Sequence, residues 1–221
     1  MAASGESKPN LRDSNEDQKP EIAAMEPLEG RVFLSASAPA GSWDAGDYYW
    51  SSDQKYPLLR ATDEMVVGFE HTKGAPRLAR ELIAEDGPLR GFKFSQWLGS
   101  GIANFKRKTP LTVAKFRATR RKTDAAPGVS WASPGFVSVG QGGPFRMSVV
   151  NSLYVTLDGT VDPAEVFAKG FTGYSGGEDN HYTVNMVKGG VMALRSGNWL
   201  KEHVPGVIQA SADHWSTVIL L

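Results

Sequence analysis

The chain has 221 residues, and its 24 Lys and Arg balance its 24 Asp and Glu, so its formal net charge at pH 7 is zero. This balance gives no support to nucleic acid as the partner of the whole chain. The chain has no cysteine, which excludes disulfides and thiolate metal sites, while 41% hydrophobic residues suffice for a buried core. No apolar run approaches the ~20 residues of a membrane-spanning helix.

Residues 1–41 are rich in polar and charged side chains and are predicted to be a disordered leader without an apolar signal segment. Within it, 25–36 combines charge with a short apolar run. Six of its residues resemble the LEPR-type amino-terminal motif of exported planctomycete proteins, with Gly30 in place of that motif's proline: Leu28, Glu29, Arg31, Leu34, Ser35 and Ala36. The resemblance implies a sorting-like motif and a location in the cell envelope or outside the cell. A chance amphipathic segment in a cytoplasmic protein is the alternative.

An aromatic-rich segment follows at 42–57, with Trp43, Tyr48, Tyr49, Trp50 and Tyr56. Clustered aromatics are typical of carbohydrate stacking or of an exposed interface. They are also typical of an extra strand, because aromatic side chains bury large areas and favour strands. We expect the extra strand.

An internal repeat organises the rest of the chain. Pro-Gly-Val-Ser-Trp-Ala-Ser at 127–133 recurs as Pro-Gly-Val-Ile-Gln-Ala-Ser at 205–211, with five of seven positions identical. Each copy follows a helix-like stretch and opens an alternating, strand-like segment. Upstream of each copy the same order of elements is predicted from residue patterns: strands 64–70, 92–98 and 129–136 with helices 76–85 and 111–123, then strands 153–158, 181–187 and 207–212 with helices 162–169 and 191–203.

This order predicts an α+β fold made of two tandem ferredoxin-like sandwiches of β-α-β-β-α-β type, each with an antiparallel sheet. The first unit is predicted at 42–139 and the second at 146–215, joined by a linker at 140–145. Residues 216–221 are an apolar carboxy-terminal tail. The helix at 162–169 has its expected N-cap in Asp162, with Pro163 at the first helical position.

The same order resembles the amino-terminal prodomain region of subtilisin-like serine proteases, especially of the fervidolysin type. The resemblance is carried by a short set of segments: Tyr154–Leu157, Pro163–Lys169, Tyr182–Val184, Ala193–Leu194 with Trp199–Leu200, and Pro205–Ala210. It implies an intramolecular chaperone or inhibitor whose partner is a subtilisin-like catalytic domain, in cis in a longer gene or in trans. A product-like tail would then enter the protease cleft, formed by Ala210, Ser211, Ala212, Asp213 and His214.

The catalytic motifs of that family do not occur in the sequence. None of the four histidines, His71, His181, His203 and His214, stands in a His-Gly-Thr setting, and Asp158-Gly159-Thr160 is predicted to be a turn. We therefore expect no enzymatic activity, no cofactor and no metal site. The chain ends about where the family's catalytic domain would begin, so a truncated protease gene is a further alternative.

A basic stretch is the remaining signal. No acidic residue occurs from Gly87 to Thr123, while eight cations fall close together: Lys106, Arg107, Lys108, Lys115, Arg117, Arg120, Arg121 and Lys122. They predict either a patch for an anionic partner or a solvated helix face balanced elsewhere. Sparse aromatics among them disfavour nucleic acid. The alternative function is thus an envelope or extracellular binding or adhesion module using 106–122 and 43–56. The oligomeric state is not predicted.

Overall fold

The computed structural model describes residues 41–51, 53–138, 145–168 and 170–218, all of which belong to one compact unit. The leader, apart from Gly41, and the sorting-like motif lie outside the described residues, as do 140–144 of the predicted linker and 219–221 of the predicted tail. No helix in the described ranges is long and apolar enough to cross a lipid bilayer.

The first half of this unit contains five strands and two longer helices. They are β1 (Ser42–Ser51), β2 (Gln54–Phe69), α1 (Ala75–Ile83), β3 (Lys93–Gly99), β4 (Ile102–Lys106), α2 (Val113–Asp124) and β5 (Val129–Ser138), with a 3-10 turn at Thr72–Gly74. Their strand order is β3-β4-β2-β5, and β1 forms a hairpin with β2. The prediction that the aromatic segment forms an extra strand is therefore confirmed.

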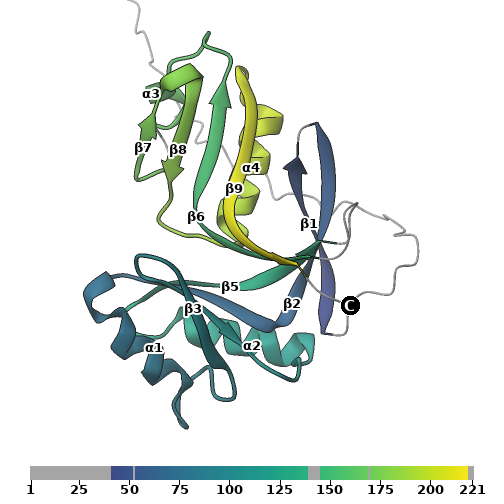
Figure 1. The fold of residues 1–221 in the computed structure, drawn as a ribbon, viewed down its shortest axis with the longest axis vertical. Helices are drawn as coiled ribbons and strands as arrows, with labels where there is room; N and C mark the ends of the chain where they lie inside the picture. Colours follow the sequence, from purple (N-terminus) through teal and green to yellow (C-terminus); the bar gives the residue numbers. More distant parts are fainter. Residues whose placement is uncertain (1–40, 52, 139–144, 169, 219–221) are drawn as a thin grey trace, which may run out of the picture. The chain divides into compact units, whose positions relative to one another are not determined.

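The second half repeats this arrangement. Its elements are β6 (Phe145–Leu157), α3 (Pro163–Val166), β7 (Gly173–Gly176), β8 (His181–Asn185), α4 (Val191–His203) and β9 (Val207–Val218), with a 3-10 turn at Glu178–Asn180. The strand order β7-β8-β6-β9 matches that of the first half element for element. Helix α2 packs on β5, and α4 packs on β9 and β6 (Figure 1).

The expectation of two tandem ferredoxin-like sandwiches is nevertheless wrong. All nine strands belong to one antiparallel sheet, because β5 and β6 pair directly through Phe136–Ser138 and Phe145–Met147. The sheet also curls. Trp131, on the face of β5 that points away from the α1–α2 core, packs with Val150 of β6, and the indole of Trp215 in β9 donates a hydrogen bond to the Leu98 carbonyl at 2.7 Å. The two halves therefore share one sheet and part of their packing.

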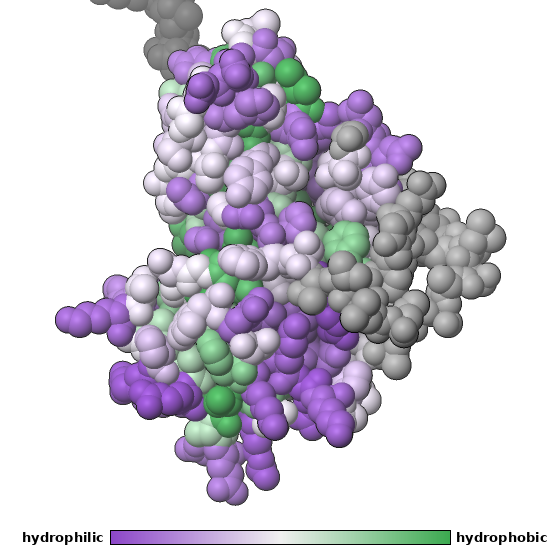
Figure 2. All heavy atoms as spheres, viewed as in Figure 1, coloured by the Kyte–Doolittle hydropathy of each residue, from purple (hydrophilic) through white to green (hydrophobic). Residues whose placement is uncertain are grey.

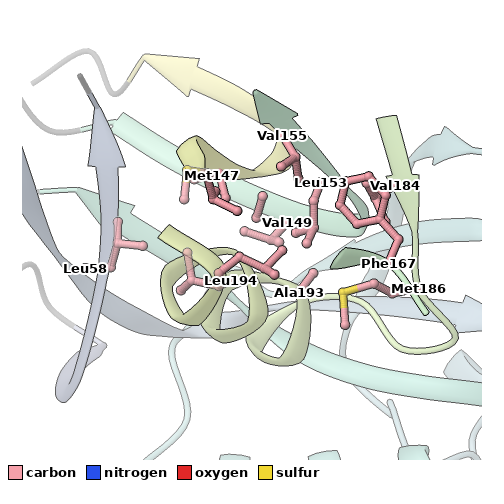
Figure 3. Close-up of a cluster of buried hydrophobic side chains, with 14 of the residues drawn as sticks. Leu58, Met147, Val149, Leu153, Val155, Phe167, Val184, Met186, Ala193 and Leu194 are labelled. Carbon is pink, nitrogen blue, oxygen red and sulfur yellow. The ribbon is translucent and has the colours of Figure 1, made fainter. Parts of the chain in front are cut away.

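The hydrophobic core shows the same continuity. One cluster lies between α4 and strands β6, β8 and β9, and it includes Leu58 of β2 and Phe136 of β5 from the first half (Figure 3). A second cluster lies under α1 and α2, with Met65, Phe105 and Phe116 among its members. Side chains alternate along β2, so Val67 enters the second cluster while Val66 faces the opposite side of the sheet.

The Pro-Gly repeat marks equivalent corners in the two halves. Gly128 and Gly206 have positive φ values of 77° and 81°, a conformation that glycine adopts without steric cost. Each glycine carbonyl accepts a hydrogen bond from the residue after the first long strand of its half, Glu70 N–H at 3.0 Å and Asp158 N–H at 2.9 Å. The repeat therefore forms the turn between α2 and β5 in the first half and between α4 and β9 in the second.

Most predicted elements occur close to their predicted positions. The helices expected at 76–85, 111–123 and 191–203 are α1, α2 and α4. Asp162 caps α3 by accepting from the Ala164 N–H at 2.8 Å. That helix ends at Val166 rather than at 169, since Phe167 leaves helical geometry. Strand β9 extends beyond the predicted 212, so Ser216–Val218 of the predicted tail are part of the sheet.

A buried polar cluster joins the two halves where β2 changes register, between Arg60 and Met65. Glu64 is 1% exposed, and its carboxylate accepts hydrogen bonds from Ser148 Oγ at 2.6 Å and from Asn104 Nδ2 at 3.0 Å. Arg146 of β6 contacts Glu64 at 3.3 Å and forms a bidentate pair with Asp63 at 2.8 Å. The hydrogen bond and charge of Asp63, with a smaller contribution from Glu64, raise the pKa of Arg146 although burial opposes this. The cluster ties β2 and β4 to β6.

Candidate anion-binding site

A cavity of about 560 Å³ lies beside α2 and α4, and we call it the arginine cavity. Its lining consists of five arginines and four uncharged residues: Arg60, Arg117, Arg120, Arg121, Arg195, Trp43, Pro134, Val191 and Met192. Helix α2 contributes three of the arginines, while β2 and α4 contribute one each. Both halves of the sheet therefore build the site. Hydrophilic residues also dominate the surface of the part that contains α1 and α2 (Figure 2).

Two of these arginines are fixed by a buried carboxylate. The Asp47 side chain is 1% exposed and accepts from Arg60 Nε at 2.5 Å and Nη2 at 3.1 Å. Arg195 Nε and Nη2 donate to Asp47 Oδ1 at 3.3 and 3.2 Å. A buried carboxylate needs such compensation, and bidentate guanidinium contacts restrict the orientation of the arginine side chain. Asp47 thereby orients one arginine from each half.

Trp43 of β1 forms the aromatic wall of the cavity. Its ring centroid lies 5.8 Å from the Arg60 guanidinium carbon and 5.9 Å from that of Arg117, within the range of cation–π attraction. The ring also packs against Phe116 of α2 at 5.7 Å. Because Phe116 is buried, this contact holds one side of the Trp43 indole against the core, and the guanidinium groups of Arg60 and Arg117 lie near the same ring. Trp43 thus positions two guanidinium groups.

The three α2 arginines carry charge that no carboxylate in the described ranges pairs with. Arg120 donates to the Ala132 carbonyl at 3.4 Å, and neither Arg117 nor Arg121 forms an ion pair with a described residue. Among the five guanidinium groups of the cavity, those of Arg60 and Arg195 pair with a carboxylate of the described residues, that of Asp47, and the other three do not. Such an excess of one sign within one cavity attracts anions.

A second basic cavity, of about 540 Å³, borders α2, and we call it the lysine cavity. Its cations are Lys115 and Lys122 of α2, together with Arg90 and Arg107, and Asp86 is its acidic residue. Arg107 is held by the Thr109 carbonyl at 2.9 Å and the Arg90 carbonyl at 3.3 Å. The lysine cavity therefore has fewer guanidinium groups and less charge excess than the arginine cavity.

The predicted basic stretch is thus divided between two sites. Arg117, Arg120 and Arg121 line the arginine cavity, whereas Arg107, Lys115 and Lys122 line the lysine cavity. Lys106 lies at the end of β4 opposite Lys93, and Lys108 is exposed in the following loop; neither lines a cavity.

Sequence reasoning missed the partners that complete the arginine cavity. Arg60, Arg195 and Asp47 stand far from the basic stretch along the chain, in segments with mixed charge. Trp43 belonged to the predicted aromatic segment, but nothing in the sequence linked it to α2. The missing signal is tertiary, because β1, β2, α2 and α4 are separated along the chain and come into contact only in the folded structure.

The predicted protease-cleft residues lie within β9. Ala210 and Ala212 are buried in the core, and Ala210–Ala212 pair with Leu153–Val155 of β6. Asp213 accepts from Ser152 Oγ at 2.9 Å, and its charge, with burial and a hydrogen bond, raises the pKa of Tyr154. His214 Nδ1 lies 3.1 Å from the Ala212 carbonyl. Entry of these residues into a protease cleft would require β9 to leave the sheet.

Comparisons with known proteins add no relative. No protein-family model matches the chain, and searches of curated proteins and of solved structures found no match. Within the described residues there is also no group of three or more His, Asp or Glu that could hold a metal ion. The two basic cavities are therefore the features of the structure from which a function can be inferred.

Proposed function

We propose that the protein is a non-catalytic binding module whose arginine cavity takes an anionic group of its ligand. The observation that carries the proposal is the convergence of five arginines from β2, α2 and α4 on one cavity, with Asp47 as the carboxylate that contacts two of them, Arg60 and Arg195. Guanidinium groups offer planar pairs of donors that match carboxylate, sulfate and phosphate oxygens. This favours an oxyanion over a halide or a neutral ligand.

Preorganisation supports the same proposal. Asp47 and Trp43 hold Arg60 from two sides, and Trp43 also contacts Arg117. Crowded like charges repel one another, so an anion that enters the cavity relieves repulsion as well as making new hydrogen bonds. Because these side chains are already ordered before the ligand binds, the entropy cost of binding is smaller. Val191, Met192 and Pro134 give the cavity an apolar wall for the rest of the ligand.

Neutralising the α2 arginines tests this proposal. We expect the triple variant R117Q/R120Q/R121Q to bind uronate, sulfate-ester and phosphate-ester probes at least about tenfold more weakly than the unchanged chain, since one charged hydrogen bond contributes about 1.5–3 kcal/mol. Isothermal titration at low and at physiological salt measures the loss. Exposed charges are screened by salt, so the affinity of the unchanged chain should fall as salt rises.

The matched control removes three exposed cations elsewhere, in the variant K73Q/R77Q/R80Q at and before α1. It has the same net charge as the triple α2 variant but leaves the arginine cavity intact. Equal losses of affinity in the two variants would show that the net charge of the protein, and not the arginine cavity, determines anion binding. Absence of binding by the unchanged chain to any of the three probes would remove the proposal.

The function as a protease prodomain remains a prediction, and a separate experiment tests it. Mixing the purified chain with a subtilisin-like protease at micromolar concentration should then inhibit cleavage of a peptide substrate or assist refolding of the protease. Strand β9 pairs along its length with β6, so inhibition by an inserted strand should appear slowly, as β9 detaches. No inhibition and no refolding assistance would count against this function and would leave the anion-binding proposal untouched.

A further inference from the structure

The two basic cavities flank one helix. Arg117, Arg120 and Arg121 line one cavity, while Lys115 and Lys122 line the other. At about 3.6 residues per turn, these two sets point to nearly opposite sides of α2. Phe116 and Thr123 form the buried stripe between them on the inner side. The outer surface of α2 is therefore the route from one cavity to the other.

That outer surface carries small side chains, and it has no acidic residue before the last position of the helix. Ala114 and Ala125 are exposed on it, and Ala118 is partly exposed, so small side chains leave room for a ligand. Arg121 of the arginine cavity and Lys122 of the lysine cavity are consecutive, exposed residues that connect the two sites. The acidic residue of α2, Asp124, is at its last position, where it accepts from the Ala132 N–H at 2.9 Å.

We infer that a single extended acidic polysaccharide lies across α2 and places anionic groups in both cavities. This inference rests on the proposed function of the arginine cavity and specifies its ligand. An α-helix with its side chains is about 10 Å across. A single anion cannot reach both cavities, whereas a chain of several charged sugars can. This span and the charge on both sides of the helix fit an extended polyanion.

The aromatic side chains favour a polysaccharide over a single-stranded nucleic acid. Nucleic-acid sites of this kind stack bases on exposed aromatic rings. Among the described residues, the arginine cavity has one aromatic lining residue, Trp43, whose ring already packs against Phe116 and two guanidinium groups, and the lysine cavity has none. Phe116 of α2 is itself buried. Uronate and sulfated sugars need no such platform, because guanidinium and ammonium groups recognise their charged oxygens directly.

Binding to both cavities predicts a dependence on ligand length. Once one cavity is occupied, the second contact becomes intramolecular, which raises the apparent affinity by about 10²-fold or more. We therefore expect long galacturonate oligomers to bind at least about 100-fold more tightly than the galacturonate monomer, compared per uronate. Titration calorimetry with the full chain and a graded series of oligomers measures this. Thermal unfolding of each variant checks that it remains folded.

The decisive variant changes the lysine cavity alone. K115Q/K122Q removes two exposed charges of the lysine cavity, and we expect it to lose most of the preference for long oligomers over the monomer. The variant K73Q/R77Q serves as the charge-matched control and should keep the length dependence. This pattern would support the inference together with the proposed function.

Three results would overturn it in distinguishable ways. Long oligomers that bind no more tightly per uronate than the monomer, or whose affinity survives K115Q/K122Q, would refute bridging while leaving the arginine cavity as an anion site. Failure of every anionic probe to bind would refute the proposed function itself. Single-stranded DNA of matched charge that binds as tightly as the oligomers would refute the assignment to polysaccharide.

Discussion

Replacing Glu64 by alanine is expected to lower the free energy of unfolding by about 3–5 kcal/mol, because it breaks a buried charged cluster. The Glu64 carboxylate is 1% exposed and receives hydrogen bonds from Asn104, Ser148 and Arg146. Its loss removes the acceptor of the buried Ser148 hydroxyl, at about 1–3 kcal/mol, and one of the two acceptors of Asn104 Nδ2, which keeps Ser148 Oγ at 3.2 Å. Urea denaturation followed by circular dichroism measures the change.

The matched control for this prediction is Glu64→Gln. Glutamine keeps the volume and one carbonyl acceptor for Asn104 and Ser148, and Arg146 retains its bidentate pair with Asp63. We expect this variant to lose about 1–2 kcal/mol, the range of a single hydrogen bond to a charged group. Equal losses for the alanine and glutamine variants would contradict this prediction, because they would assign the whole contribution of the side chain to its negative charge and none to its volume or to the hydrogen bonds that glutamine keeps.

The helices and strands could be predicted from local sequence patterns. The architecture, in which contacts such as those of Glu64 join the two halves, could not. Helix α4 was predicted at 191–203 because its apolar spacing and the following Pro205-Gly206 turn are local signals. The pairing of Phe136–Ser138 with Phe145–Met147 joins strands on either side of a Gly-rich stretch at 140–144, which was predicted to be a linker between two separate units. Each half has the strand order of a small sandwich, so sequence periodicity alone cannot reveal that β5 and β6 make one sheet.

For the same reason, only part of the candidate site could be predicted from the sequence. Arg117, Arg120 and Arg121 stand together in the sequence, so a charge count finds them. Their grouping into one cavity depends on helical spacing, which a helix prediction also supplies. Arg195 reaches that cavity from α4, where it stands apart from Lys201 and His203 in a helix of mixed composition. The continuous sheet brings Arg195 next to Arg60, and Asp47 forms hydrogen bonds with both arginines.

Substituting alanine for Gly190 is the second prediction with a large effect, and it tests the contact that seats α4 on the first half. Gly190 precedes α4 with φ 63° and ψ −127°, a conformation that side chains rarely adopt. A Cβ there would lie 2.1 Å from both Cβ and Oγ of Ser133 in β5. The Ser133 hydroxyl accepts from the Val191 N–H at 3.1 Å, so movement away from the clash also breaks a hydrogen bond at the start of α4.

We expect Gly190→Ala to cost about 2–4 kcal/mol, combining an unfavourable backbone conformation with overpacking. Gly74→Ala is the matched control, since Gly74 has φ −91° and a Cβ there would meet no atom within 4 Å; its cost should stay within about 0.5 kcal/mol. Arg195 and Met192 follow Gly190 in α4, so a displaced α4 should weaken anion binding at temperatures where the variant remains folded. Full affinity and full stability in Gly190→Ala would mean that α4 does not depend on this contact, and that the arginine cavity tolerates movement between its two halves.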